Sequence, residues 1–144
     1  MPEKETLERA RRDKREGKAP STQAGEFVRE EIEHIREGKH GARSTKQAIA
    51  IGLSKARRAG VDLPPSKGSS EETKEQAERD ISKAHSGGKT SAKRSRAMRK
   101  ALKREGRSAA SKEALSTQAR KAARKRSAAS RSRSAKKAAA TRKK

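Results

Sequence analysis

The chain has 144 residues, of which 41 are Lys or Arg and 18 are Asp or Glu, so its formal net charge is +23. Only 15 residues are Met, Leu, Ile, Val or Phe, and this composition excludes a large packed interior. Without cysteine the chain can form no disulfide and no thiolate metal site, and no apolar stretch is long enough for a signal peptide or a membrane-spanning helix.

Residues 1–20 predict a marginal N-terminal helix. The segment is rich in helix-forming residues, but only Leu7 and Ala10 give it an apolar face. We expect Ser21 or Thr22 to cap the helix that follows.

Residues 21–63 predict a small helical hairpin. Apolar side chains recur with helical spacing in its first half, and a polar turn leads to a second N-cap at Ser44. Ala48, Gly52 and Ala56 recur every four positions in the second half, which would allow a neighbouring helix to approach closely. Because the hairpin holds nine of the 15 large apolar residues, too few to offset the ordering of its backbone, we expect it to pack against another copy of the chain or to order on a partner.

The second half of the chain is predicted to form a basic extension. Residues 64–70 are a linker of Pro, Gly and Ser, residues 71–126 predict basic helical segments with few apolar anchors, and residues 127–144 are low in complexity and predict a disordered basic tail. The expected fold class is therefore mostly α, with a small helical hairpin followed by a long basic tail that is partly disordered or conditionally helical.

The strongest functional signal is the charge of this extension. Residues 81–144 contain 23 Lys or Arg against only Glu105 and Glu113, which favours a polyanionic partner. The only aromatic residue, Phe27, falls on the expected core face, so stacking on bases is disfavoured and contacts to the phosphate backbone remain. We therefore expect sequence-tolerant binding or compaction of nucleic acid, DNA in preference to RNA. The expected phosphate contacts are Lys93, Arg94, Arg96, Arg99, Lys100, Lys103, Arg104, Arg107, Arg120, Lys121, Arg124, Lys125 and Arg126.

Two other interpretations stay open. Residues 21–60 could form a sequence-specific helix-turn-helix, with Lys46, Lys55, Arg57 and Arg58 as secondary contacts. Alternatively, the hairpin could dock on a protein partner while the tail localises this adaptor to RNA or ribosomes. Binding measurements on isolated fragments of the chain would distinguish a nucleic-acid-binding protein from an adaptor that docks on a protein.

Nothing in the sequence predicts an enzyme, a cofactor or a metal site. The string from Ser86 to Thr90 lacks the earlier glycine and the preceding strand of a phosphate-binding loop. The three histidines, His34, His40 and His85, are scattered along the chain, and His34 reads as a polar helix residue.

Arg-Glu-Gly followed by a basic residue occurs at residues 15–18, 36–39 and 104–107, each time ahead of Ser-Thr. Convergent capping and duplication of a helix-loop-helix unit both explain this pattern. The stretch GEFVREEIEHIREGKHGARSTKQAIAIGLSKARRAGVDLP resembles a family of small, basic, largely uncharacterised bacterial proteins, some of them labelled DNA-binding or plasmid-stabilisation proteins. The tail is similar in composition to linker-histone-like proteins. These resemblances imply chromosome or plasmid packaging and a cytoplasmic, nucleoid-associated location.

Overall fold

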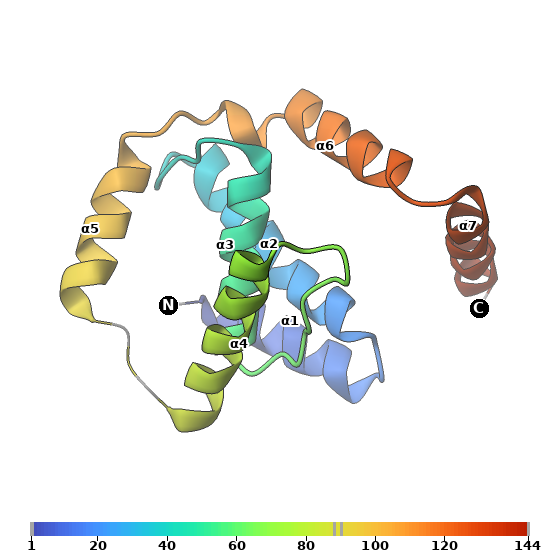
Figure 1. Ribbon diagram of the computed structural model, residues 1–144, viewed down its shortest axis with the longest axis horizontal. Coiled ribbons are helices and arrows are strands. Elements are labelled where there is room, and N and C mark those ends of the chain that lie inside the picture. Colours follow the sequence, from blue (N-terminus) through green and yellow to red (C-terminus); the bar gives the residue numbers. More distant parts are fainter. Residues whose placement is uncertain (1, 88, 90, 144) are drawn as a thin grey trace.

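The structure is a computed structural model that describes residues 2–87, 89 and 91–143 (Figure 1). Over these residues the chain forms seven α-helices and one short 3₁₀ turn, η1. In chain order they are α1 (Lys4–Arg15), α2 (Pro20–Arg36), α3 (Thr45–Arg58), α4 (Glu71–Ser86), α5 (Ala92–Lys103), η1 (Ser108–Ala110), α6 (Lys112–Arg124) and α7 (Ala128–Arg142).

Helices α2 and α3 pack closely against each other at the centre of the molecule. Gly52 makes this approach possible, because a Cβ atom at this position would lie 2.6 Å from Cα of Val28 on α2. Ala48 and Ala56, one turn to either side of Gly52, are completely buried. The prediction that these three small residues admit a neighbouring helix is therefore confirmed.

Two small clusters of apolar residues form the core. One lies between α1, α2, α3 and the segment after α3, around the fully buried ring of Phe27. Its buried members are Ala10, Ala24, Phe27, Ala56 and Val61, and Leu7, Leu53 and Leu63 pack against them.

The second cluster includes residues from the basic half of the chain. Ile32 and Ile35 of α2 meet Ala42 and Ala48, and Ala109 and Ala110 of η1 close the cluster. These alanines cost little conformational entropy when they are buried, and they fit where α2, α3 and η1 come close together.

Hydrogen bonds hold η1 and the end of α5 against the turn between α2 and α3. The bonds run from Gly41 N to Leu102 O (2.8 Å), from Ala42 N to Gly106 O (3.1 Å), from Thr45 Oγ1 to Ala109 O (2.7 Å) and from Arg36 Nε to Ala110 O (2.9 Å). At Gly41 the two segments are so close that a Cβ atom would lie 2.0 Å from the carbonyl oxygen of Glu105. We call residues 102–111, which make these contacts, the junction segment.

Helix α4 packs on α3 with an ion pair in which the carboxylate is buried and the guanidinium group is partly exposed. Asp80 is fully buried, and its Oδ1 accepts a hydrogen bond from Nε of Arg58 at 2.8 Å. Ala77, one turn earlier on α4, is also fully buried. This helix therefore belongs to the packed part of the chain.

Serine side chains cap several helices. Ser44, Ser70, Ser111 and Ser127 each accept a hydrogen bond from a backbone amide in the first turn of the helix that follows. The expected cap at Ser44 is confirmed. The expected cap of α2 is wrong, because that helix begins at Pro20, whose ring fixes φ near its helical value.

The expected fold class is wrong. Instead of a small hairpin followed by a long, partly disordered or conditionally helical tail, helices continue through the described residues up to Arg142, and the junction segment packs into the core. Helix α7 lies within residues 127–144, which were expected to be disordered. Alanine favours helix locally, Ser127 caps α7, and the Arg126 guanidinium bonds to Ser130, so repulsion among exposed and solvated charges does not unfold this segment.

Candidate nucleic-acid interface

Helix α5 presents a stripe of positive charge. At about 100° per residue, five of its basic residues fall within an arc of about 120°, and the buried Leu102 lies on another side of the helix. These five residues, all exposed, are Lys93, Arg96, Arg99, Lys100 and Lys103. We call them the α5 stripe. Arg94, on the same helix, lies outside this arc and is also exposed.

The basic residues of the junction segment lie where it meets α2. Arg104 follows α5 directly, and Arg107 precedes η1. Nη1 of Arg107 donates to the carbonyl oxygen of Arg36 at 3.4 Å. A shallow hollow at this place is lined by Arg36, Arg107, Ala110, Ser111 and Lys112.

Helix α6 carries a second stripe of charge. Arg120, Lys121, Arg124 and Lys125 are all exposed and share one side of the helix, whereas the partly buried Leu115 faces the core. Arg126 follows, and it donates hydrogen bonds to the Ser130 side chain and carbonyl group. The end of α6 and the beginning of α7 are therefore joined by this guanidinium.

The thirteen residues expected to contact phosphates share one electrostatic property. All of them are exposed, and among the described residues none has a carboxylate oxygen within 4.0 Å, which is the distance of an ion pair. The first half of the chain differs only in part. Carboxylates there pair with residues such as Arg9, Lys18 and Lys55, whereas the basic residues of α1 other than Arg9 have no such partner among the described residues. In the described part of the chain, exposed cations without a carboxylate partner therefore occur on α5, the junction segment and α6, and also on α1 and α7.

The secondary contacts expected on α3 are mostly used inside the molecule. Lys55 pairs with the buried Glu31, Arg57 is buried and donates to the carbonyl oxygen of Leu63, and Arg58 pairs with Asp80. Lys46 is exposed. The helix-turn-helix interpretation is weakened, because these side chains hold α3 against α2, α4 and the segment after α3.

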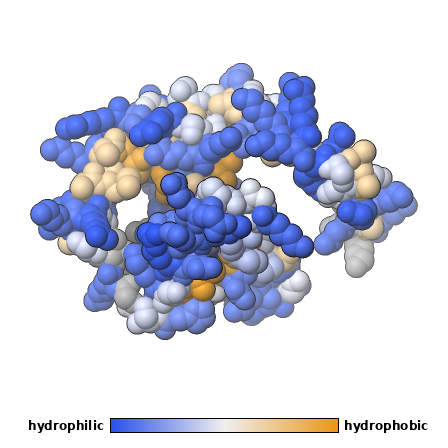
Figure 2. Space-filling view, viewed as in Figure 1, coloured by the Kyte–Doolittle hydropathy of each residue, from blue (hydrophilic) through white to orange (hydrophobic). Residues whose placement is uncertain are grey.

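Helix α7 adds basic residues that were not among the expected contacts. Arg131, Arg133, Lys136 and Lys137 are exposed on it, and none of its residues is buried. In the sequence, only the number of basic residues in this segment could have identified them. Figure 2 shows hydrophilic residues over most of the visible surface, with the most hydrophobic residues near the middle of the molecule.

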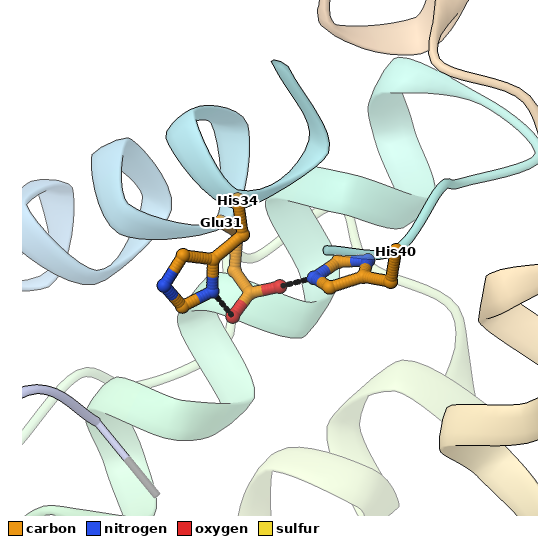
Figure 3. Close-up of side chains that lie close together, drawn as sticks. All are labelled: Glu31, His34 and His40. Carbon is orange, nitrogen blue, oxygen red and sulfur yellow. Dashed lines mark ion pairs between the residues drawn. The ribbon is translucent and has the colours of Figure 1, made fainter. Parts of the chain in front are cut away.

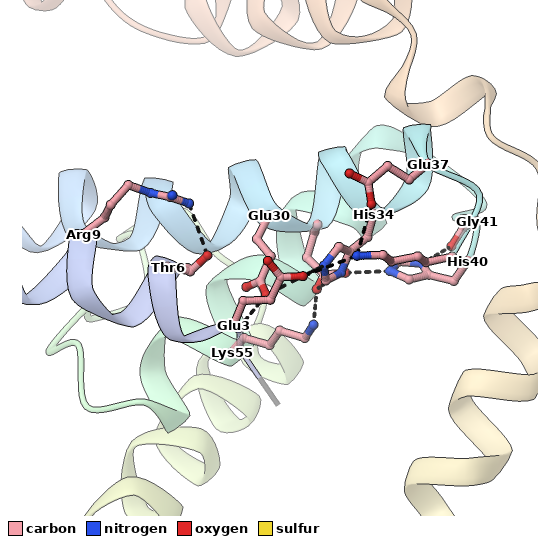
Figure 4. A network of polar contacts seen from close by, with 11 residues as sticks. Glu3, Thr6, Arg9, Glu30, His34, Glu37, His40, Gly41 and Lys55 are labelled. Carbon is pink, nitrogen blue, oxygen red and sulfur yellow. Dashed lines mark hydrogen bonds and ion pairs between the residues drawn. The ribbon is translucent and has the colours of Figure 1, made fainter.

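A second group of polar side chains, unrelated to these basic stripes, lies beside α2 (Figure 4). Glu30 and Glu31 are buried, and His34 Nε2 lies 3.0 Å from Oε1 of Glu3. The hydrogen bond with His34, and then that with Lys39, lower the pKa of Glu3 below 4.5. Sequence spacing did not indicate that His34 and His40 would meet here, because the loop after α2 brings them together.

No helix in the described part of the chain has the length and apolar character needed to cross a lipid bilayer. His85, the third histidine, lies on α4, where its Nδ1 is 2.9 Å from the carbonyl oxygen of Ile81. It does not join the group around His34.

The first part of the chain matches a protein-family model. No curated protein and no solved structure matches the chain. Residues 4–67, which contain α1, α2 and α3, match the model of a family of unknown function, DUF6496. The first half of the chain is therefore similar to the members of this family, whereas the basic helices α5, α6 and α7 lie outside the match.

Proposed function

We propose that this protein binds nucleic acid without sequence preference, DNA rather than RNA, through contacts between its basic helices and the phosphate backbone. The α5 stripe carries this proposal. Five exposed cations on one side of a helix, none of them neutralised by a carboxylate among the described residues, suit a ligand with regularly spaced negative charges.

The arrangement of apolar residues favours contacts to the backbone over reading of bases. Phe27, the only aromatic residue, is fully buried and so is not accessible to a base. Met98 is the one large hydrophobic side chain that is exposed in the described part of the chain. Base stacking therefore has no exposed aromatic group to perform it, and Met98 on α5 is the single large apolar side chain in the described residues that could act as a wedge.

The hollow between α2 and α6 is suited to one of the phosphates. Arg36, Arg107 and Lys112 bring three cations to its rim, and the first turn of α6 adds backbone amides. Arg107, Ala110 and Ser111 of this hollow belong to the junction segment, which connects α5 to α6, and we propose that one nucleic acid contacts both helices and the hollow together.

The structure offers less support for the adaptor interpretation. Most of the apolar residues of α2 and α3, which would have formed a docking surface, are covered by α1, η1 and the residues after α3, although Ile49 and Ile51 are partly exposed. The same packing leaves less apolar surface for the homo-oligomer that was expected to form through the hairpin.

Salt-dependent binding to duplex DNA, structured RNA and heparin tests the proposal. The full chain should bind DNA more tightly than RNA at equal salt, with a log–log salt slope of about −0.9 for each phosphate contacted. Replacing Lys93, Arg96, Arg99 and Lys100 by Gln should reduce the steepness of this slope by up to about 3.6, which is four contacts at 0.9 each.

A variant with the same net charge serves as the control. Replacing Lys4, Arg11, Lys14 and Arg15 on α1 by Gln removes four exposed positive charges from a helix outside the proposed interface. If both quadruple variants lose the same affinity, only net charge matters and the assigned interface is wrong. If the native chain fails to bind any of the three polymers at low salt, the proposal as a whole is wrong.

A further inference from the structure

Three side chains with metal-binding atoms meet near the C-terminal end of α2. Glu31 and His34 are three residues apart on the helix, and His40 follows in the loop after it (Figure 3). One nitrogen or carboxylate oxygen from each residue lies within 4.8 Å of those of the other two. Glu31 is fully buried, and the side chains of His34 and His40 are only 14% and 12% exposed.

In each imidazole ring, the nitrogen that faces away from Glu31, which we call the outer nitrogen, lies close to a hydrogen-bond acceptor. Nε2 of His34 lies 3.0 Å from Oε1 of Glu3, and Nδ1 of His40 lies 2.9 Å from the carbonyl oxygen of Gly41. Because a carboxylate and a carbonyl oxygen can only accept, the outer nitrogen of each ring is suited to carry a proton. For His40 the inner nitrogen also faces an acceptor, so its neutral ring can carry the proton on either side. Metal-binding histidines in proteins are commonly oriented in this way by a carboxylate or a backbone carbonyl group.

The inner nitrogens of both rings face the same carboxylate. Nε2 of His40 lies 3.0 Å from Oε2 of Glu31, and Nδ1 of His34 lies 4.0 Å from Oε1 of Glu31. When the proton of His40 is on Nδ1, the short approach of Nε2 to Oε2 is not a hydrogen bond, because neither atom then carries a proton. In that tautomer the two atoms remain close only when a cation lies between them or a second proton is added to the ring.

Glu31 Oε2 supplies the second observation. This oxygen is buried, and among the described residues it has no hydrogen-bond partner unless Nε2 of His40 carries a proton. The other oxygen of Glu31 is held by the ammonium group of Lys55, which fixes the carboxylate and leaves Oε2 directed at His40. A buried acceptor without a partner is costly, and a bound cation would remove this cost.

The charges around the cluster are compatible with a divalent ion. Four carboxylates and two ammonium groups lie in it or pair around it, so two negative charges are left when both rings are neutral. They are Glu3, Glu30, Glu31, Glu37, Lys39 and Lys55.

We propose that Glu31, His34 and His40 bind one divalent transition-metal ion of the zinc type, through the Glu31 carboxylate, Nδ1 of His34 and Nε2 of His40. Two imidazoles and one carboxylate are ligands that zinc accepts, and a fourth position is left for water. Glu3, Glu30 and His34 form an overlapping group. This group is the poorer candidate, because it has a single imidazole and Glu3 is half exposed.

The ion would join the loop after α2 to the helix itself. His40 precedes Gly41, whose N–H donates to Leu102 at the end of α5. Metal binding would therefore stabilise the loop that holds the junction segment, and this role does not depend on the proposed binding of nucleic acid.

Zinc titration of the full chain, freed of metal with a chelator, tests the proposal. Isothermal titration calorimetry should show one Zn²⁺ per chain with a dissociation constant of about 1 μM or tighter. Zinc should also raise the melting temperature. In ¹H–¹⁵N spectra of the histidine rings, zinc should shift Nδ1 of His34 and Nε2 of His40 and leave the ring of His85 unchanged.

Matched histidine variants identify the ligands. His40→Gln should weaken zinc binding at least about tenfold, whereas His85→Gln, which alters an exposed histidine on α4, should bind zinc as tightly as the native chain. The ring spectra of the native chain give the answer even where a variant fails to fold.

Three results would overturn the proposal. The first is no zinc binding, with both rings doubly protonated at neutral pH, which would show an ion-pair network in place of a metal site. The second is weak binding of several ions per chain, and the third is equal loss of affinity in the His40 and His85 variants.

Discussion

The hydroxyl group of Thr45 donates a hydrogen bond of 2.7 Å to the carbonyl oxygen of Ala109, and both residues are buried. This bond links positions that are 64 residues apart. It connects the first turn of α3 to η1, and so joins the half of the chain that holds most of the large apolar residues to the half that carries most of the positive charge.

Replacing Thr45 by Val should destabilise the fold by about 1–3 kcal/mol, because the buried carbonyl group of Ala109 loses its donor while the side-chain shape is kept. Urea unfolding followed by circular dichroism measures this loss. Thr22→Val is the control, since Thr22 is exposed on α2, and it should change stability by less than about 0.5 kcal/mol. Equal stabilities of the two variants would show that the bond to Ala109 contributes nothing.

Replacing Gly52 by Ala should destabilise the fold, whereas replacing Gly25 by Ala should stabilise it. A methyl group at Gly52 meets the backbone of Val28, and such overpacking costs about 1–3 kcal/mol. At Gly25, also within a helix, nothing lies within 4 Å, so alanine should gain about 0.5–1 kcal/mol from helix propensity. Thermal unfolding of the two variants should therefore shift in opposite directions, and a shift of the same sign would contradict the close packing of α2 and α3.

Arg58 and Asp80 should be coupled in a double-mutant cycle. Removing Arg58 leaves the buried carboxylate of Asp80 with only the bond from Gln76, so Arg58→Ala should cost about 1–3 kcal/mol. Replacing both residues by Ala should cost less than the sum of the single changes, with a coupling of about 0.5–3 kcal/mol. Additive free energies of unfolding would show that α4 does not dock on α3 through this pair.

Lys18 should make stability depend on pH in the alkaline range. Its hydrogen bond with Asp13, and then that with Glu16, raise the pKa of Lys18 above its usual value of 10.5. Since the pKa is higher in the folded state, this contribution to stability is complete below the unfolded value of about 10.5 and is lost as the pH rises through the folded value.

Lys18→Gln should therefore be less stable than the native chain at pH 9, and the difference should shrink above about pH 10.5. Lys14→Gln provides the comparison, because it alters an exposed lysine near the end of α1, four residues before Lys18. Urea unfolding at a series of pH values measures both. A difference for Lys18→Gln that stays constant up to pH 12 would contradict the pairing with Asp13.

The sequence predicts the parts of the fold that depend on local patterns. The small residues Ala48, Gly52 and Ala56 share one face of a helix because of their spacing, and Ser44 is a preferred cap in any context. Ala109 and Ala110 gave no comparable signal. Alanine is common on both surfaces and cores, and the groups that bury this pair are far away in the sequence.

The candidate site was predictable to a similar extent. Residue type alone indicates the exposed cations of α5 and α6, because only two carboxylates accompany them. It does not reveal that Lys55 and Arg58 are paired with buried carboxylates, since Glu31 and Asp80 lie 24 and 22 residues away. For the same reason, the proximity of His34 and His40 could not be predicted without knowing the path of the loop between them.

The junction segment has a consequence for how ligands and folding affect each other. It is anchored on the turn between α2 and α3, and α5 and α6 extend from its two ends (Figure 1). A polymer that binds both α5 and α6 would stabilise the state in which the junction segment is packed on this turn, relative to states in which it has dissociated. By thermodynamic linkage, such binding would also protect the buried side chains of Phe27 and Ile35 from unfolding, although the polymer does not contact them. Conversely, a substitution that destabilises the core around Phe27 and Ile35 would lower the affinity of the protein for the polymer.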